Sequence, residues 1–284
     1  MNPRYPIYIL SKGRADSRLT VKALEKMNVP YRIFIEPCDY TDYVQYIDKK
    51  NIEVLPFENL GQGGIPARNF IWDYAIEHNT ERHWIVDDNI DAFYRLNRGL
   101  RIRVTSGTIF RCAEDFTDRY ENVALSGLNY RFFAVNPSQL PPYYLNTRIY
   151  SCILIKNDIP YRWRGRYNED TDLSLRVMRD GYCTILFNAF LAGKIASMQM
   201  SGGNTDTVYT DGDERRKFAE SLQEQHPEYV KVDRRYNRWH HVVDYTPFKR
   251  NVLIKKKGLI VPKGINTYGM ILKEELGDVP DPLP

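Results

Sequence analysis

The chain has 284 residues, 43% of them hydrophobic and 13% aromatic, which is the composition of a folded protein and excludes a disordered chain. Its 40 Lys and Arg against 36 Asp and Glu leave a net charge of +4, too small to indicate a nucleic-acid partner by itself. No apolar run approaches the roughly 20 residues of a membrane-spanning helix, and the first residues do not follow the pattern of a secretory signal. We therefore expect a soluble, intracellular protein located in the cytoplasm.

Strands and helices alternate in the first third of the chain. The hydrophobic pattern predicts strands at residues 6–10, 31–35, 52–56 and 83–86, and helices at 19–27, 40–50 and 66–78. Alternation of this kind predicts βαβ units and a mainly parallel sheet flanked by helices, which is the α/β fold class. In such a sheet, ligands bind beyond the carboxyl ends of the strands.

The pattern is weaker in the remainder of the chain. It predicts strands at residues 124–128 and 149–155 and a helix at 171–180. No linker rich in Pro, Gly or Ser interrupts it, so we expect one domain at residues 1–254, followed by a C-terminal extension and tail at 255–284. Lys, Arg and aromatic side chains are concentrated at residues 231–263, which predicts a basic, aromatic surface.

Two polar loops follow predicted strands and could hold a nucleotide. The first is S-K-G-R at residues 11–14, whose two cations suit a ribose or a phosphate, although surface turns often have this composition. The second is GQGGIPARN at residues 61–69, where Arg68 and Asn69 lie in the first turn of a helix and Arg68 could pair with a diphosphate. The second loop matches neither a P-loop nor the G-x-G-x-x-G fingerprint, which disfavours the common ATP and NAD sites.

Three polar residues follow the predicted strand in HWIVDDNI, namely Asp87, Asp88 and Asn89. Adjacent carboxylates repel each other unless a cation or donors lie between them, and hard oxygen ligands suit Mg²⁺ or Mn²⁺ holding a diphosphate. The alternative is a loop whose carboxylates cap the next helix. Either His240 or His241, in the later segment RWHH, could complete a metal site or be structural.

A second acidic group lies in RWRGRYNEDTDLSLR, residues 162–176, at a predicted helix start. Helix capping and an Asp172–Arg176 pair four residues apart are the structural explanation of these charges. Asp170 is a further carboxylate, next to Glu169 and beside a predicted phosphate site. It is a candidate general base that would take the proton of an acceptor hydroxyl.

The order of these motifs resembles the GT-A glycosyltransferases. The segments YILSKGR, GGIPARNFIW, HWIVDDNI, RYENVALSGLNY, NTRIYSCILI, RWRGRYNEDTDLSLR, SGGNTD and RWHHVVDY look like the TET-associated glycosyltransferases of bacteriophages. This GT-A family is implicated in adding sugars to oxidised 5-methylpyrimidines in DNA. The resemblance runs from about residue 5 to residue 254. It implies a Rossmann-like GT-A fold, to which the basic aromatic segment is a C-terminal extension.

The resemblance also implies roles for matching residues. The nucleotide would be held by Ser11, Arg14, Arg68 and Asn69, and its ribose by Asp87. A Mn²⁺ or Mg²⁺ ion would be bound by Asp88 and His241, with His240 as an equal rival to His241. Asp170, beside Glu169, would match the base of inverting members. The residues expected at the DNA acceptor are Arg162, Trp163, Arg164, Arg166, Arg238 and Trp239.

The expected function is metal-dependent transfer of a sugar from a UDP-sugar to the hydroxymethyl group of 5-hydroxymethylcytosine in phage DNA, in the cytoplasm of the infected host. A basic aromatic segment agrees with a DNA acceptor, because Lys and Arg bind phosphates and rings stack on bases. The alternatives are a glycosyltransferase with another acceptor, a metal-dependent nuclease and a DNA-binding module without activity. The sugar and the anomeric outcome remain open.

Overall fold

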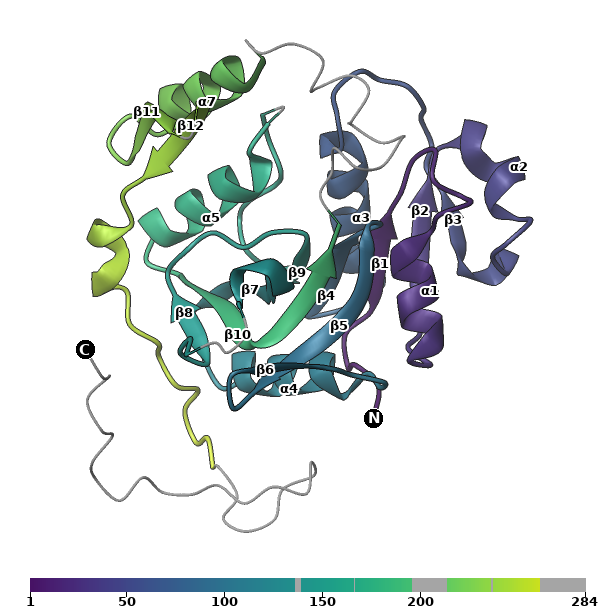
Figure 1. The fold of residues 1–284 in the computed structure, drawn as a ribbon, viewed down its shortest axis with the longest axis horizontal. Helices are drawn as coiled ribbons and strands as arrows, with labels where there is room; N and C mark the ends of the chain where they lie inside the picture. The colour runs from purple at the N-terminus through teal and green to yellow at the C-terminus, as the bar shows by residue number, and fades with distance from the viewer. Residues whose placement is uncertain (136–138, 166, 196–213, 236, 261–284) are drawn as a thin grey trace.

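The computed structural model describes residues 1–135, 139–165, 167–195, 214–235 and 237–260, and it is built on one ten-stranded sheet between helices (Figure 1). The strands of the sheet are β1 (Ile7–Leu10), β2 (Arg32–Ile35), β3 (Ile52–Val54), β4 (Arg82–Asp87), β5 (Ile90–Asn97), β6 (Leu100–Arg103), β7 (Val123–Tyr130), β8 (Tyr143–Leu145), β9 (Cys152–Lys156) and β10 (Cys183–Lys194). The helices are α1 (Leu19–Lys26), α2 (Tyr40–Tyr43), α3 (Ile65–Glu77), α4 (Thr108–Thr117), α5 (Glu169–Arg179) and α7 (Glu214–Gln225). Short 3₁₀ helices are η1 (Pro37–Asp39), η2 (Lys49–Asn51), η3 (Arg131–Phe133) and η5 (Thr246–Arg250).

The first half of the sheet is parallel. Strands β3, β2, β1 and β4 lie in this order, and the connections between them contain α1, α2 and α3. The predicted α/β class is therefore confirmed, and the four predicted strands and the helices at α1 and α3 are found close to their expected bounds. The helix expected at residues 40–50 is wrong beyond Tyr43. There the side chain of Asp48 accepts a hydrogen bond from the amide of Lys50 and begins η2 instead.

The second half adds both parallel and antiparallel strands. Strand β9 is antiparallel to β4 and β7, β10 is parallel to β7, and β5, β6 and β8 are antiparallel to their partners. Strands β7 and β9 approach closely at Gly127, where a Cβ atom would collide with the carbonyl of Cys152. This topology brings the carboxyl ends of β1, β4, β7 and β10 to one edge of the sheet, where β9 begins.

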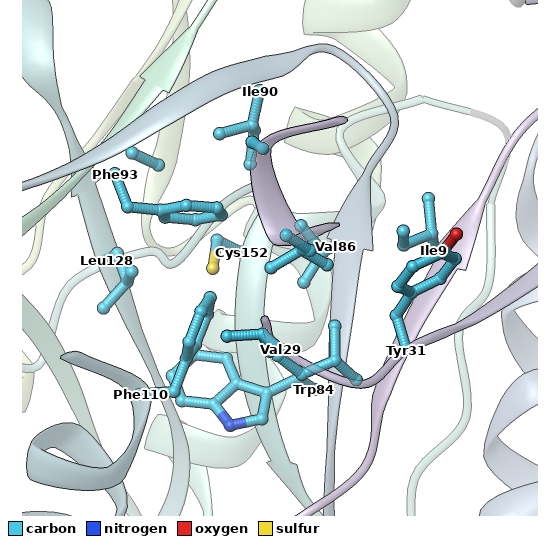
Figure 2. Close-up of a cluster of buried hydrophobic side chains, with 14 of the residues drawn as sticks. Ile9, Val29, Tyr31, Trp84, Val86, Ile90, Phe93, Phe110, Leu128 and Cys152 are labelled. Carbon is cyan, nitrogen blue, oxygen red and sulfur yellow. The ribbon is translucent and has the colours of Figure 1, made fainter. Parts of the chain in front are cut away.

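Hydrophobic side chains alternate between the two faces of the sheet. Ile9, Trp84 and Val86 pack with α1 and α4 on one face, in the cluster that Figure 2 shows, whereas Tyr8 and Ile85 pack with α3 and α5 on the other. Because the sheet is covered on both faces, its strands are held rigidly, and the polar residues that follow them have defined positions. None of the helices in the described ranges has the length and apolar character that crossing a bilayer demands.

A small unit follows the sheet. Strands β11 (Val230–Arg235) and β12 (Arg238–Val243) form an antiparallel hairpin against α7, and Figure 1 shows this unit beside α5. From there the chain returns to the sheet domain, where the amide of Ile254 donates to Asn122 Oδ1 at 2.9 Å. The boundary between 254 and 255 stays a prediction, and residues 261–284 lie outside the described part of the chain.

Candidate active site

A cleft of about 440 Å³ lies at the carboxyl edge of the sheet. Its walls come from the ends of β1, β4 and β10, the beginnings of α3 and α5, and strand β12. Eight residues predicted from separate motifs line it together: Ser11, Arg14, Arg68, Asp87, Asp88, Glu169, Asp170 and His241. They meet because parallel strands end at the same edge, and because the start of α5 and strand β12 contribute residues to the same cleft.

Asp87 ends β4 between two cations. Its carboxylate accepts from Arg68 Nη2 at 3.0 Å and from Lys194 Nζ at 2.7 Å. Burial alone would raise the pKa of Asp87, but Lys194 and Arg68 hold it well below its usual range. Asp87 is therefore ionised, and it holds both cations in the lining of the cleft.

Asp88, the next residue, also lines the cleft and is buried. Its Oδ1 accepts from Arg14 Nη1 at 2.6 Å, and its Oδ2 accepts from Ser11 Oγ at 2.6 Å. Burial raises the pKa of Asp88, and Arg14 opposes this shift. Ser11 is also hydrogen-bonded to the hydroxyl of Tyr43, so it connects Asp88 to the core beneath. These bonds hold the carboxylate in one orientation.

Arg68 is the cation closest to the second acidic group. Besides Asp87, its guanidinium lies 3.7 Å from Glu169 Oε1 and 4.0 Å from Asp170 Oδ1. Burial would lower the pKa of Arg68, but Asp170, Asp87 and Glu169 raise it above its ordinary value. One buried cation therefore balances carboxylates from β4 and from α5.

Asp170 differs from the other carboxylates of the cleft. Its Oδ1 is buried and has no hydrogen-bond partner among the described residues. Burial raises the pKa of Asp170 to about 7, with Glu169 and Asp87 adding to the shift and Arg68 and Lys194 opposing it. A carboxyl group whose pKa lies near neutral pH is suited to proton transfer.

Asp172 has a structural role, as the alternative interpretation predicts. It is 1% exposed and accepts from Arg164, from Arg176 at 2.8 Å and from His226 Nε2 at 2.8 Å. His226 directly follows α7, so this network joins the unit of α7, β11 and β12 to α5. It thereby positions both the helix that carries Asp170 and the hairpin that carries the two histidines.

Two predicted residues lie away from the cleft. Asn69 forms two hydrogen bonds with the backbone of Trp163, at 3.0 and 2.9 Å, so its amide is used to hold the segment before α5. The expectation that Trp163 contacts DNA is wrong for this structure, because the side chain is 2% exposed and lies between Trp72 and Arg68. A buried ring has no face left on which a base can stack.

The other residues predicted to contact DNA lie on or near the surface, where that role stays a prediction. Arg162 pairs with Asp73, and Arg164 pairs with Asp172 while its side chain is 48% exposed. Arg238 is exposed on β12, and the ring of Trp239 lies 5.1 Å from the guanidinium of Arg216. The prediction for Arg166 falls outside the described residues.

The comparison with protein families decides what kind of enzyme has this cleft. Residues 5–203 match the family model of TET-associated glycosyltransferases. The chain belongs to this family. It is therefore a glycosyltransferase, which moves a sugar from a donor to an acceptor. The match is shorter than the expected extent of residues 5–254. It includes Asp87 and Asp88 at the end of β4 and also Glu169 and Asp170 at the start of α5.

Two solved structures resemble the fold of this glycosyltransferase distantly. A putative nucleotide-diphospho-sugar transferase from Desulfovibrio desulfuricans G20 has 9% identity and a TM-score of 0.38, covering 65% of this chain and 80% of that one. Mannose-6-phosphate isomerase from Helicobacter pylori has 10% identity and a TM-score of 0.30, covering 89% and 94%. Neither likeness supports a conclusion about activity. No curated protein matches the chain.

The residues of the glycosyltransferase cleft fit a divalent cation that is shared with a diphosphate. Within the described residues, no three His, Cys, Asp or Glu side chains are grouped so as to hold a metal ion alone. A diphosphate supplies oxygen ligands itself, and the two carboxyl oxygens of Asp88 retain lone pairs besides those that accept from Arg14 and Ser11. His240 Nε2 and Asn89 Oδ1 are buried and have no hydrogen-bond partner in the part of the chain that the structure describes, and both residues line the cleft.

The two histidines of β12 differ in their surroundings. Burial, Arg148 and His240 lower the pKa of His241 to about 4, so its imidazole is neutral at pH 7 and has a lone pair available to a metal ion. His240 contributes the unpartnered Nε2. Both line the cleft, so the choice between them as the ligand stays open.

Lys194 is a charged residue of this cleft that the sequence prediction missed. Strand β10 ends with it, and its Nζ also donates to Ser151 Oγ at 2.5 Å. Burial would lower the pKa of Lys194, but Asp87 raises it above its ordinary value, so it stays charged. The sequence does contain a signal for Lys194. The mainly apolar run CTILFNAFLAG predicts a strand that ends directly before this cation, in the same way as HWIV predicts a strand that ends directly before the carboxylate of Asp87.

Proposed function

We propose that this glycosyltransferase moves a sugar from a UDP-sugar to the hydroxymethyl oxygen of 5-hydroxymethylcytosine in DNA, with inversion and with the help of a divalent cation. The observation that carries the proposal is Asp170, whose buried Oδ1 has no hydrogen-bond partner among the described residues and whose pKa is raised to about 7, in one cleft with Arg14, Arg68 and Lys194. The resemblance to phage enzymes supports the DNA acceptor and a site of action in the infected cell.

The donor diphosphate would bind between Arg14, Arg68 and Lys194. All three line the cleft, and their charges are partly balanced by Asp87 and Asp88. The N-terminus of α3, preceded by Gly63 and Gly64 in the cleft wall, adds amide groups that suit phosphate oxygens. This arrangement supplies positive charge where the leaving group gains negative charge.

Asp170 would act on the acceptor. Its carboxylate takes the proton of the hydroxymethyl group as that oxygen forms a bond to the anomeric carbon of the sugar. The bond between this carbon and the phosphate oxygen breaks, and its electron pair leaves with UDP. Arg68 and Lys194 stabilise the departing charge, and Glu169 keeps Arg68 oriented. A bound divalent cation, held by Asp88 and by His240 or His241, would supply Lewis-acid neutralisation of the diphosphate.

Nucleoside mass spectrometry tests the function. The protein is incubated with Mn²⁺, a panel of UDP-sugars and DNA containing either cytosine or 5-hydroxymethylcytosine. We expect a sugar mass on the hydroxymethylated base alone, lost on addition of EDTA and strongly reduced in Asp88→Asn. Hydrolysis of a UDP-sugar without a DNA product would retain the glycosyltransferase and reject the DNA acceptor. Strand cleavage without any donor would reject sugar transfer to DNA in favour of a nuclease.

Substitution of Lys194 by Met is expected to weaken UDP binding at least about tenfold, because a hydrogen bond to a charged group contributes roughly 1.5–3 kcal/mol. The methyl-capped side chain keeps the packing over Tyr130, which lies 5.5 Å from Nζ. Isothermal titration calorimetry with UDP measures the effect. The control is Lys156→Met, which removes a cation paired with Asp158 outside the cleft. Equal UDP affinity in Lys194→Met and the parent protein would remove Lys194 from the donor site.

A further inference from the structure

A strip of four aromatic rings leads from the molecular surface into the cleft. It consists of Tyr150, Tyr130, Phe132 and Phe133, and we call it the aromatic strip. Tyr130 ends β7, the two Phe residues form η3, and Tyr150 precedes β9. Because β7 ends and β9 begins at the cleft edge of the sheet, the strip lies at the edge where Asp87 and Lys194 lie.

Two of the ring contacts in the aromatic strip are stacked, and two are tilted. The centroids of Tyr130 and Tyr150 are 5.5 Å apart, and the two planes differ by 10°. Those of Tyr130 and Phe133 are 5.9 Å apart with planes at 23°, and Phe132 lies 5.1 Å from Tyr130 with planes at 33°. Tertiary packing of aromatic residues elsewhere in this protein is mainly edge to face, as for Tyr8, Phe34 and Tyr74. Phe132 and Phe133 lie 4.4 Å apart with planes at 55°, so the stacked rings of Tyr150, Tyr130 and Phe133 end in a tilted pair at η3.

The outer end of the aromatic strip is open to solvent. Phe132 is 53% exposed and Phe133 is 51% exposed, and no residue of η3 is buried. The inner end is part of the cleft, because Tyr150 lines it and the hydroxyl of Tyr130 bonds Ser151, which in turn bonds Lys194. The strip therefore connects bulk solvent with the reacting groups, which a purely structural aromatic cluster has no reason to do.

Cations surround the aromatic strip. The guanidinium of Arg148 lies 4.8 Å from the ring of Tyr150, and Lys194 Nζ lies 5.5 Å from the ring of Tyr130. Arg131, inside η3, donates to the hydroxyl of Tyr94. Flat apolar faces beside positive charges match a ligand made of planar bases and phosphates, and this is the composition of single-stranded nucleic acid.

We propose that the aromatic strip binds unpaired bases of the acceptor DNA by stacking and guides the target base to the cleft. The inference rests on the proposed function, because it takes DNA as the acceptor. It adds to that function the protein surface to which this DNA binds. The DNA bound in this way is single-stranded or locally opened, because a base inside a duplex has both faces covered. Phosphates on either side are neutralised by Arg131 and Arg148.

The test measures binding of fluorescent oligo-dT and of a 5-hydroxymethylcytosine oligonucleotide, by anisotropy and without a donor. We expect the double substitution Phe132→Ala with Phe133→Ala to weaken binding of both at least about tenfold, because stacking contributes roughly 1–3 kcal/mol per base. The KM for DNA rises in parallel, while hydrolysis of the UDP-sugar is unchanged. The control is Tyr40→Ala, which removes a ring that is 37% exposed on α2.

Two further variants distinguish stacking from other contacts. Substitution of both Phe residues by Trp retains flat faces and is expected to retain DNA binding, whereas substitution by Leu retains apolar area without them and is expected to lose it. Equal affinity of the parent, Ala and Leu variants for oligo-dT overturns the inference, as does the absence of any oligonucleotide binding. Full binding by the Leu variant alone would indicate an apolar partner such as a peptide and would overturn it too.

Failure of the proposed function gives a different result. If the protein binds oligo-dT through the strip but adds no sugar to 5-hydroxymethylcytosine, the surface stands and the acceptor base is wrong. If the protein modifies 5-hydroxymethylcytosine and the Ala variant does so with an unchanged KM for DNA, the function stands and the strip is not the DNA site. A melting temperature equal to that of the parent confirms that each variant is folded.

Discussion

Substitution of Asp170 by Asn is expected to lower kcat by roughly 10²- to 10⁴-fold, which is the usual contribution of a general base. Asn has the shape of the carboxyl group but takes no proton, so UDP binding and the metal requirement are expected to stay as in the parent. Single-turnover transfer to DNA and calorimetric titration with UDP measure the two quantities separately. The matched control is Asp180→Asn at the other end of α5, where the side chain is 45% exposed.

The same group predicts the pH dependence. Burial raises the pKa of Asp170 to about 7, and only the deprotonated carboxylate acts as a base. We therefore expect kcat to be low below pH 6, to rise through about pH 7 and to level off above it. The residual kcat of Asp170→Asn is expected to lack this rise with pH. If the Asn variant turns over at most of the parent rate with unchanged donor binding, the reaction does not use Asp170 as its base and inversion is not supported.

Substitution of Asp172 by Ala is expected to lower the free energy of unfolding by about 3–5 kcal/mol, which is the cost of leaving buried charges without their partner. Asp172 is 1% exposed, and its removal leaves Arg176 and His226 buried without the carboxylate that binds them. The side chain of Arg164 is half exposed and is solvated more easily. Urea unfolding measures the loss, with Asp158→Asn as the control at an exposed pair.

The contribution of Asp172 also depends on pH. Burial would raise its pKa, but His226, Arg164 and Arg176 lower it to about 2 in the folded protein, against 3.8 ordinarily. A lowered pKa means that this stabilisation is complete above about pH 4 and is lost as the pH falls towards 2. The Asp172→Ala variant lacks this pH-dependent stabilisation. The difference between its free energy of unfolding and that of the parent protein should therefore shrink as the pH falls from about 4 towards 2. A difference below about 1 kcal/mol at pH 7 would mean that the network joins α5 to α7 without stabilising the fold.

Much of the fold was predictable because the signals are local. Each strand of the parallel half is a short apolar run followed by a polar turn, and α3 follows its glycine loop. Strands β5 and β10 were missed although both are long. Their pairing with each other, between residues about 100 positions apart, is decided by contacts that no local pattern contains. The same reason explains why the antiparallel part of the sheet was not predicted.

Local sequence patterns alone indicate which residues lie at the carboxyl edge of the parallel sheet. Ser11, Arg68 and Asp88 belong to turns that directly follow strands or open a helix, so the strand order alone brings them into one cleft. The family match adds the reaction class to that local information. Trp163 shows the limit, because the segment before α5 is basic and aromatic in sequence, yet packing against Trp72 buries the ring.

The electrostatics of the site, by contrast, depend on the assembled fold. Lys194 reaches Asp87 although 107 positions separate them, and Asp170 has a raised pKa because the surrounding chain excludes water from its oxygen. Desolvation and charge interactions depend on distances in space, and these are established only when β4, β10 and α5 are assembled. The residue types at the site are therefore a property of the sequence, whereas their protonation states and partners are a property of the fold.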